Sequence, residues 1–426
     1  MSADHWGSAM PESSRHRMVG GLVGAGARHL AARLPVSRRA AALGLAGALV
    51  VGVTPAATTA ATAAAAPAGA APTVAVAPVA VAPAVSAPAD ALERRPGRRG
   101  PAIAARYSWE QAAPARLPDG SPNTLASKAV GIDDAGHVAG NSLDAAGTAV
   151  GSFLGAGRDS NWLPSAAGSF AGTVMAMAVA ANGTVVGGAN SIEASFPLWD
   201  RRGRLRLVLT PGSHYGPVPG AVNSSGVTAG VLVGVKVGQL FYGRPDRLRA
   251  LPSLREGNYR VTGISETGTA VGSRHHPFMR NDGHYPEGIV FTAAGTENIK
   301  TTQTSTVDAI SPNGRYLIGR VGPDLWEADR GRLAWVSTSR EPVYLRGVGQ
   351  LKARAVTDSG LVVGSNGERA ALWQDGRLVD LNDRLRGLPR GWALTDVVAV
   401  AKSGALAVNA TDASGRSIAL KVSPSR

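Results

Sequence analysis

Hydrophobic and polar positions alternate along residues 128–426 in a pattern that returns at regular intervals. In each copy, an alternating apolar segment runs into a short polar turn with a glycine, and a second apolar segment follows. Alternation with a period of two residues predicts β-strands. Asn, Asp or Ser followed by Gly predicts a tight hairpin, because glycine adopts the positive φ that such a turn requires. Each copy therefore begins with a predicted β-hairpin.

The pattern occurs seven times, at spacings of 42 to 47 residues between the turn glycines. After each hairpin, an aromatic residue ends one further predicted strand, and a Leu-x-Leu-like segment after a polar turn forms the next. Four strands in a repeat of about 45 residues are typical of a propeller blade. The turn glycines are Gly136, Gly183, Gly226, Gly268, Gly314, Gly360 and Gly404.

The two ends of the repeat region complement each other. The last copy stops after residues 417–423, and residues 105–118 read as the strand pair that follows a hairpin in the other copies. Pairing these segments would complete one blade from both termini and remove an exposed sheet edge. We therefore predict an all-β fold, a β-propeller of seven four-stranded blades closed by pairing of its N- and C-terminal strands. The insertion at residues 273–300 leaves an eighth, degenerate blade as the alternative.

Two further sets of repeated residues predict how the blades pack. A second glycine ends most hairpins, and we expect it where strands approach each other closely. These residues are Gly140, Gly187, Gly230, Gly272, Gly319 and Gly364. Large aromatic residues recur later in the repeat, and we expect them to pack between blades and not to form a sugar-stacking platform. They are Trp199, Phe241, Phe291, Trp335 and Trp373.

The repeat resembles the HAF-type extracellular repeat family of bacterial proteins. The resemblance rests on Ala129-Val-Gly-Ile-Asp-Asp-Ala-Gly-His-Val-Ala-Gly140, on Ala371-Leu-Trp-Gln-Asp-Gly-Arg-Leu-Val-Asp-Leu381 and on the closing segment Ser417-Ile-Ala-Leu-Lys-Val422. It covers about residues 105–426. It implies export and a propeller-like fold. It implies no established activity and no set of catalytic residues.

The N-terminal quarter of the chain has the composition of an export segment and a spacer. Residues 1–63 combine a basic start, an uncharged apolar stretch at 40–53 and a small-residue exit at 61–63, which predicts a secretory signal peptide. Ser37-Arg38-Arg39 resembles a twin-arginine signal, and the general export route and an uncleaved anchor are the alternatives. Met18 is a second candidate start. Residues 64–104 are rich in Ala and Pro and predict a disordered linker.

The charge of the chain does not favour a nucleic-acid partner. The formal net charge of +14 divides into +7 over residues 1–106 (11 basic, 4 acidic) and +7 over residues 107–426 (33 basic, 26 acidic). Two arginine clusters surround turns, without interleaved aromatic residues, at 201–206 and 244–249. We expect a mildly basic, solvated surface and no nucleic-acid binding. The absence of cysteine excludes disulfides, cysteine-ligated metals and thiol nucleophiles.

Candidate chemistry is sparse. His275, His276 and His284 form the one local histidine cluster, with Asp282 nearby. Adjacent histidines on a loop can bind a metal, but a tetrahedral site needs three or four ligands with supporting contacts. The sequence holds no Gly-x-Ser-x-Gly motif and no phosphate-binding loop that follows a strand. We therefore predict no catalytic residues, no metal and no cofactor, and keep these histidines as weak candidates for ligand binding.

These observations predict a secreted, extracellular binding or scaffolding module. The expected ligand is an envelope polysaccharide or a protein partner outside the cell. We expect a monomer with no stable membrane span after signal cleavage. The candidate binding loops are 141–152, 188–196, 212–218 and 273–289. The alternative is a secreted hydrolase or lyase with its site at the mouth of the propeller channel, which requires several carboxylates or the three histidines to converge with perturbed pKa values.

Overall fold

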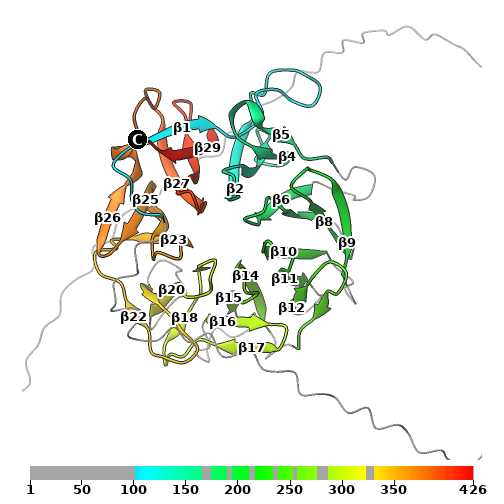
Figure 1. Ribbon diagram of the computed structural model, residues 1–426, viewed down its shortest axis with the longest axis vertical. Coiled ribbons are helices and arrows are strands. Elements are labelled where there is room, and N and C mark those ends of the chain that lie inside the picture. Colours follow the sequence, from blue (N-terminus) through cyan, green and yellow to red (C-terminus); the bar gives the residue numbers. More distant parts are fainter. Residues whose placement is uncertain are drawn as a thin grey trace, which may run out of the picture. The chain divides into compact units, whose positions relative to one another are not determined.

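Seven antiparallel sheets, arranged as blades in a ring, form the part of the chain that the computed structural model describes (Figure 1). The described residues are 101–425, without 166–173, 190–193, 211–215, 234–237, 253–256, 276–285 and 323–330. The predicted signal peptide at 1–63 and the predicted linker up to residue 100 lie outside them. The ring confirms the prediction of a seven-bladed, all-β propeller.

Blades one to three follow each other along the chain, and their strands are given from the innermost to the outermost. Blade one holds β2 (Ala126–Ile132), β3 (Val138–Leu143), β4 (Ala149–Gly155) and β5 (Asn161–Trp162), with the 3-10 turn η1 (Gly157–Asp159) before β5. Blade two holds β6 (Val174–Val179), β7 (Val185–Ala189), β8 (Ser195–Trp199) and β9 (Leu205–Leu209). Blade three holds β10 (Pro217–Val222), β11 (Thr228–Val233), β12 (Gly238–Gly243) and β13 (Arg249–Ala250).

Blades four to seven continue the ring in the same order of strands. Blade four holds β14 (Asn258–Ile264), β15 (Ala270–His275), β16 (Glu287–Thr292) and β17 (Gly295–Asn298). In blade five the innermost strand is in two pieces, β18 (Thr304–Ser305) and β19 (Ala309–Ile310), before β20 (Leu317–Gly322), β21 (Arg332–Trp335) and β22 (Val343–Tyr344). Blade six holds β23 (Leu351–Val356), β24 (Val362–Asn366), β25 (Arg369–Gln374) and β26 (Arg377–Asp380), followed by η2 (Leu381–Arg384). Blade seven holds β27 (Ala393–Val400), β28 (Leu406–Thr411), β29 (Ser417–Pro424) and β1 (Tyr107–Gln111).

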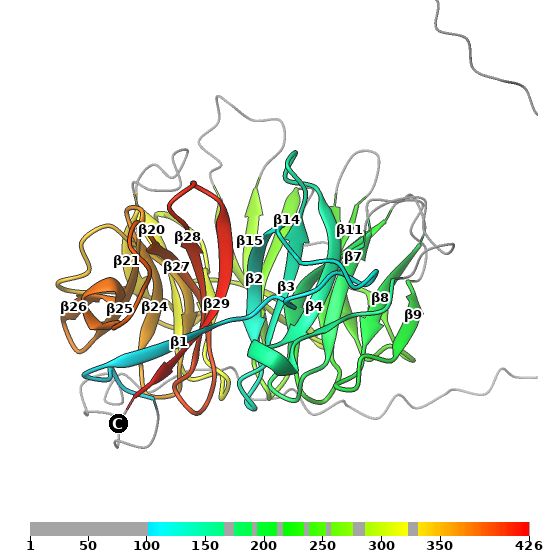
Figure 2. The ribbon, with the colours of Figure 1, turned by 90° about the horizontal axis from the view of Figure 1, so that it is seen from above.

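The N-terminal strand closes the ring. β1 pairs antiparallel with β29, in a register that runs from Tyr107 opposite Pro424 to Gln111 opposite Leu420. The two strands lie side by side in both views, β1 in cyan and β29 in red (Figure 2). This pairing confirms the predicted closure. It corrects one detail, because residues 105–118 supply one strand of the blade and not two, while β29 forms the neighbouring strand.

The insertion at 273–300 does not hide an eighth blade in the described residues, because β16 and β17 complete blade four.

Residues 101–104, the last four of the predicted linker, contact blade six. There Ser359 Oγ donates a hydrogen bond of 2.5 Å to the Pro101 carbonyl, and the Ile103 amide donates one of 3.3 Å to Gln374 Oε1.

The repeated glycines are required for two different reasons. All seven turn glycines have positive φ, between 75° and 89°. The second set lies where strands crowd, as predicted. A Cβ at Gly364 would lie 1.9 Å from the Lys352 carbonyl oxygen of the innermost strand, and one at Gly140 would lie 2.4 Å from the Phe153 ring. No side chain fits at such distances without moving backbone or aromatic neighbours.

Two adjacent glycines of β7 provide a matched test of this crowding. A Cβ at Gly187 would lie 2.6 Å from Trp199 and 2.7 Å from the Met175 carbonyl, whereas one at Gly188 meets Met177 at 3.4 Å. We expect Gly187→Ala to lower the free energy of unfolding by about 1–3 kcal/mol or more. Gly188→Ala should change it by less than about 1 kcal/mol. Urea denaturation of both variants measures the difference, and equal effects would contradict the packing argument.

Every innermost strand is irregular at the same place. In six blades the register shifts around one residue, which lies six positions before the turn glycine. In blade five, Asp308 occupies the equivalent position between β18 and β19. A bulge leaves its extra residue outside the regular ladder and redirects its side chain. The other residues at this position are Val130, Met177, Gly220, Thr262, Arg354 and Val398.

Hydrogen bonds link the hairpin turns around the ring. The Asp134 amide donates to the Ala181 carbonyl at 2.9 Å, and the Glu266 amide donates to the Pro312 carbonyl at 2.7 Å. Between blades seven and one, the Lys402 amide donates a hydrogen bond of 3.1 Å to Asp134 Oδ1. Between blades six and seven, Arg354 and Asp396 of the innermost strands form an ion pair. In the described part of the chain, no helix is long and apolar enough to cross a membrane.

Candidate functional site

Ionisable side chains gather on the inner strands of blades four to seven. We call this set the charged arc, and it consists of Arg260, Asp308, Arg320, Lys352, Arg354 and Asp396. Arg320 lies on β20, and the others lie on the innermost strands or, for Asp308, between the two pieces of one. The matching positions in blades one to three are mainly apolar: Val130, Met175, Met177, Val218 and Gly220, with Lys128 as the one charged residue.

Two positions of the repeat account for most of the charged arc. Asp308 and Arg354 stand six residues before their turn glycines, at the bulge. Arg260, Lys352 and Asp396 stand eight residues before theirs. Because the strands surround one axis, equivalent positions of neighbouring blades become neighbours in space (Figure 1). The backbone therefore places these side chains together, although they are about 45 residues apart in the chain.

Asp308 is held among cations but is incompletely paired. Arg320 Nε lies 3.6 Å from Asp308 Oδ2, and Thr306 Oγ1 donates a hydrogen bond of 3.1 Å to Asp308 Oδ1. Burial raises the pKa of the Asp308 carboxyl. Arg320, Thr306, Arg260 and Arg354, in decreasing order of effect, offset this pKa rise only in part. Oδ2 is buried and accepts no hydrogen bond from any described residue.

Asp396 repeats this arrangement one blade further on. Arg354 Nε donates to Asp396 Oδ2 at 3.0 Å. Burial raises the pKa of the Asp396 carboxyl, and the charges of Arg354 and then Lys352 lower it in part. Among the described residues, the buried Oδ1 has no hydrogen-bond donor. Arg354 therefore pairs with Asp396 and also acts electrostatically on Asp308, and each of these carboxylates has one buried oxygen that can still accept a hydrogen bond.

The charged arc can bind a ligand that carries both hydroxyl and anionic groups. Its four cations and two carboxylates give a formal net charge of +2, so the arginines and the lysine exceed what the carboxylates neutralise. Planar guanidinium groups bind carboxylate and phosphate oxygens in pairs. A buried carboxylate oxygen without a donor is stabilised when a hydroxyl supplies one.

Of the three histidines singled out by the sequence, only His275 lies in the described residues. His275 ends β15, opposite Asn258, and His276 and His284 lie outside the described residues. Partial desolvation lowers the pKa of His275, and the charge of Arg260 lowers it further. His275 thus borders the charged arc at the start of the innermost strand of blade four. Within the described ranges, no three His, Asp or Glu residues form a group able to hold a metal ion.

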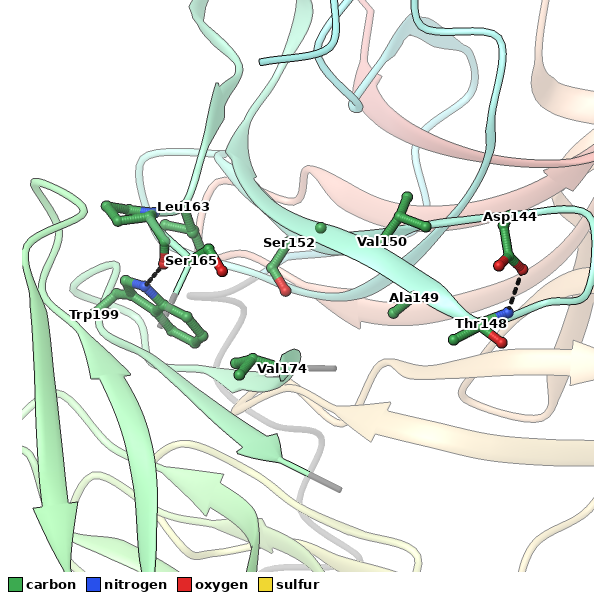
Figure 3. A pocket seen from close by; sticks show the side chains of 11 residues that line it. Asp144, Thr148, Ala149, Val150, Ser152, Leu163, Ser165, Val174 and Trp199 are labelled. Atoms are coloured by element: carbon green, nitrogen blue, oxygen red, sulfur yellow. Dashed lines mark hydrogen bonds between the residues drawn. The ribbon is translucent and has the colours of Figure 1, made fainter. Parts of the chain in front are cut away.

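A separate cavity of about 450 Å³ lies between blades one and two (Figure 3). Its walls include Val150 and Val174, together with Asp144, whose Oδ1 accepts a hydrogen bond of 2.8 Å from the Thr148 amide. Trp199 closes one side, but only 1% of this residue is exposed, and its Nε1 donates to the Pro164 carbonyl at 3.0 Å. This tryptophan packs between blades, as predicted. The cavity contains neither the charged arc nor His275.

The charged arc was not predicted from the sequence, although the repeat pattern contains a signal for it. Each of its innermost-strand residues stands at a fixed offset from a turn glycine. Lining up the repeats on these glycines shows ionisable residues at two offsets in copies four to seven. In copies one to three the same offsets are mainly apolar.

No family model and no curated protein sequence matches the chain. Solved structures are similar in fold. A streptogramin B lyase shares 10% identity with a TM-score of 0.48, covering 75% of this chain and 98% of that one. A virginiamycin B lyase from Staphylococcus aureus shares 10% sequence identity with a TM-score of 0.41, covering 76% of this chain and 95% of that one. The Dos1 propeller shares 9% sequence identity with a TM-score of 0.44, covering 74% of this chain and 95% of that one. Likeness at this level carries no argument about function, and the HAF resemblance stays a prediction.

Replacing Asp308 tests the electrostatics of the charged arc. Asp308 has a pKa raised above the unfolded value of 3.8, so the folded protein binds its proton before the unfolded chain does. The stability of the native protein relative to Asp308→Asn should therefore increase as the pH falls from 7 toward 3.8, and change no further below 3.8. At pH 7 we expect the variant to be at least as stable. Urea denaturation from pH 7 to 3 measures both unfolding free energies.

Asp412 provides a control of opposite sign. Hydrogen bonds from Ser414 and Arg416 lower the pKa of Asp412 to about 2. Its stabilising contribution is therefore present above pH 3.8 and is lost as the pH falls through about 2. Asp412→Asn should be destabilised at pH 7 and should equal the native protein near pH 2. Parallel pH profiles for the two variants would contradict this account of the charged arc.

Proposed function

We propose that the protein is an exported, non-catalytic binding module that holds an envelope polysaccharide with anionic groups at the charged arc. Export is supported by the predicted signal peptide at 1–63 and by the resemblance to HAF-type repeats. Propellers commonly bind ligands with residues that a rigid ring presents near its axis. The binding role is supported by the charged arc, which lies on such innermost strands.

The observation that carries the proposal is the combination of excess positive charge with incompletely bonded carboxylates. Arg260 is exposed on β14, and no described acidic residue forms an ion pair with it. It can therefore bind a ligand carboxylate or phosphate. The free oxygens of Asp308 and Asp396 can accept hydrogen bonds from neighbouring hydroxyls. An acidic polysaccharide offers both groups repeatedly along one chain, whereas a neutral polysaccharide offers only hydroxyls.

Removal of one unpaired cation tests this function. We expect Arg260→Ala to weaken binding to an acidic polysaccharide such as alginate by about tenfold or more, because a hydrogen bond to a charged group contributes about 1.5–3 kcal/mol. Arg377→Ala is the matched control, since Arg377 is exposed at the start of the outermost strand of blade six. Binding is measured by titration at about 0.15 M salt, with neutral dextran as the second ligand.

The outcomes separate specific recognition from general attraction. Specific binding should survive about 0.15 M salt, where exposed charges further apart than about 8 Å are largely screened. Equal losses in the two variants, or equal affinity for alginate and dextran, would contradict a site at the charged arc. Retention that disappears with salt in the native protein would show only the attraction of a basic surface.

One observation favours the alternative function of a hydrolase or lyase. Asp308 and Asp396 both have raised pKa values and both lie beside Arg354, and a carboxyl group with a raised pKa can act as a general acid. Enzyme activity would release new reducing ends or unsaturated products from the bound polysaccharide. Loss of such products in Asp308→Asn, with binding retained, would support the enzyme over the binding module.

A further inference from the structure

The outer edge of blade two is a strand with one side that no described residue pairs with. β9 is the last strand in the order β6-β7-β8-β9, and among the described residues it pairs only with β8. The amide of Thr210 donates to the Ala194 carbonyl at 2.8 Å, and the amide of Asp200 donates to the Arg204 carbonyl at 3.1 Å. These bonds determine which residues of β9 direct their peptide N–H and C=O groups toward β8.

The register directs the peptide groups of three leucines outward. Hydrogen-bonded pairs alternate with non-hydrogen-bonded pairs in an antiparallel ladder. Because the pairs involving Arg204 and Thr210 are hydrogen-bonded, the intervening even-numbered residues also bond to β8. Leu205, Leu207 and Leu209 therefore point their N–H and C=O groups away from the sheet. Pro197 stands opposite Leu207, at a position where no hydrogen bond to β9 is needed.

The side chains on this edge are unusually apolar for an outer strand. Leu209 is 76% exposed and Leu207 is 38% exposed. Four of the other outer strands are short, as in the two-residue β5, β13 and β22, or polar, as in β17 (Gly-Thr-Glu-Asn). Natural sheets commonly protect their edges by shortness and charge, since an open edge pairs readily with another strand. β9 lacks both forms of protection along its outward-facing residues.

Positively charged side chains surround the N-terminal end of β9. The turn before β9 and the strand itself carry four arginines and one aspartate over residues 200–209, a net charge of +3. Arg204 is paired with Asp200, with Nε 2.6 Å from Oδ2. Arg201, Arg202 and Arg206 are exposed, and no ion pair joins them to an acidic side chain in the described part of the chain. An extended segment on this edge would meet three free guanidinium groups.

We propose that the outer edge of β9 is a docking site for a partner protein, which adds an extended segment with alternating apolar and acidic residues as a fifth strand of blade two. The outward peptide groups of the three leucines supply the hydrogen bonds. Leu207 and Leu209 cover the apolar residues of the segment, and the free arginines bind its acidic residues. A second copy of this chain fits poorly, because each copy would bring the same +3 charge to the new interface.

A synthetic peptide tests the proposal. The probe is a labelled peptide of about seven residues that alternates glutamate and valine, the length of an ordinary strand. Its counterpart replaces each glutamate with lysine. We expect fluorescence anisotropy to show binding of the acidic probe to the full chain, weakened by salt, and at least about tenfold weaker binding of the basic probe.

Two pairs of variants locate the site. Leu207→Pro removes an outward N–H without removing a bond to β8, so the strand is retained and the docking bond is lost. It should weaken binding of the acidic probe by about tenfold or more, whereas Leu207→Thr should weaken it less. Arg201→Ser should weaken binding and reduce its dependence on salt. The control Arg244→Ser alters the matching basic turn of blade three, where the outer strand has two residues, and should have little effect.

Amide exchange shows whether the edge is free. In the protein alone, the amides of Leu205, Leu207 and Leu209 should exchange quickly, and the acidic probe should slow them. Slow exchange without the probe would overturn the proposal, because another segment of the chain would already cover the edge. A dimer that is lost in Leu207→Pro would overturn it in favour of a second copy. Equal probe binding to Leu207→Pro and the native protein would also overturn it, and retention on alginate should be unaffected by all four variants.

Discussion

The fold depends on the pairing of β1 with β29, which joins the two ends of the folded chain. Without β1, blade seven would end at an unpaired β29, and the buried cluster around Leu394, Leu420 and Tyr107 would lose one of its members. The pairing turns an array of stacked blades into a ring with no free end. Because the side chain of Tyr107, the first residue of β1, is buried, closure contributes apolar burial as well as hydrogen bonds.

In the closed ring, equivalent positions of the seven repeats lie around one axis. Every blade presents the same two backbone positions on its innermost strand, and the residue at each position decides what the ring offers there. Blades one to three mostly place Val, Met and Gly at these positions, whereas each of blades four to seven places at least one charged residue there. A symmetric backbone thus carries an asymmetric set of side chains. The charged arc and the β9 edge lie on different blades, so the two proposed binding sites are separate from each other.

Much of the fold could be predicted because its strongest signals are local. A turn glycine with positive φ and an alternating flank determine a hairpin from a few residues, and seven hairpins with complementary ends indicate a closed ring. The number of strands supplied by residues 105–118 was predicted wrongly, because β27, β28 and β29 already form three strands of blade seven and leave room for one more. The bulges carry no residue signature, since Val130, Thr262 and Arg354 share no chemistry. Lining up the repeats on their turn glycines shows the charged positions, but only the ring shows that these positions are neighbours in space.

Hydrogen–deuterium exchange with and without alginate tests the central claim, that the charged arc is where this propeller binds its ligand. The account predicts slower exchange on the innermost strands of blades four, six and seven, at residues 258–264, 351–356 and 393–400, and no change on β6 and β10. Protection confined to blades one to three, or bound alginate without any protection of the innermost strands, would contradict it.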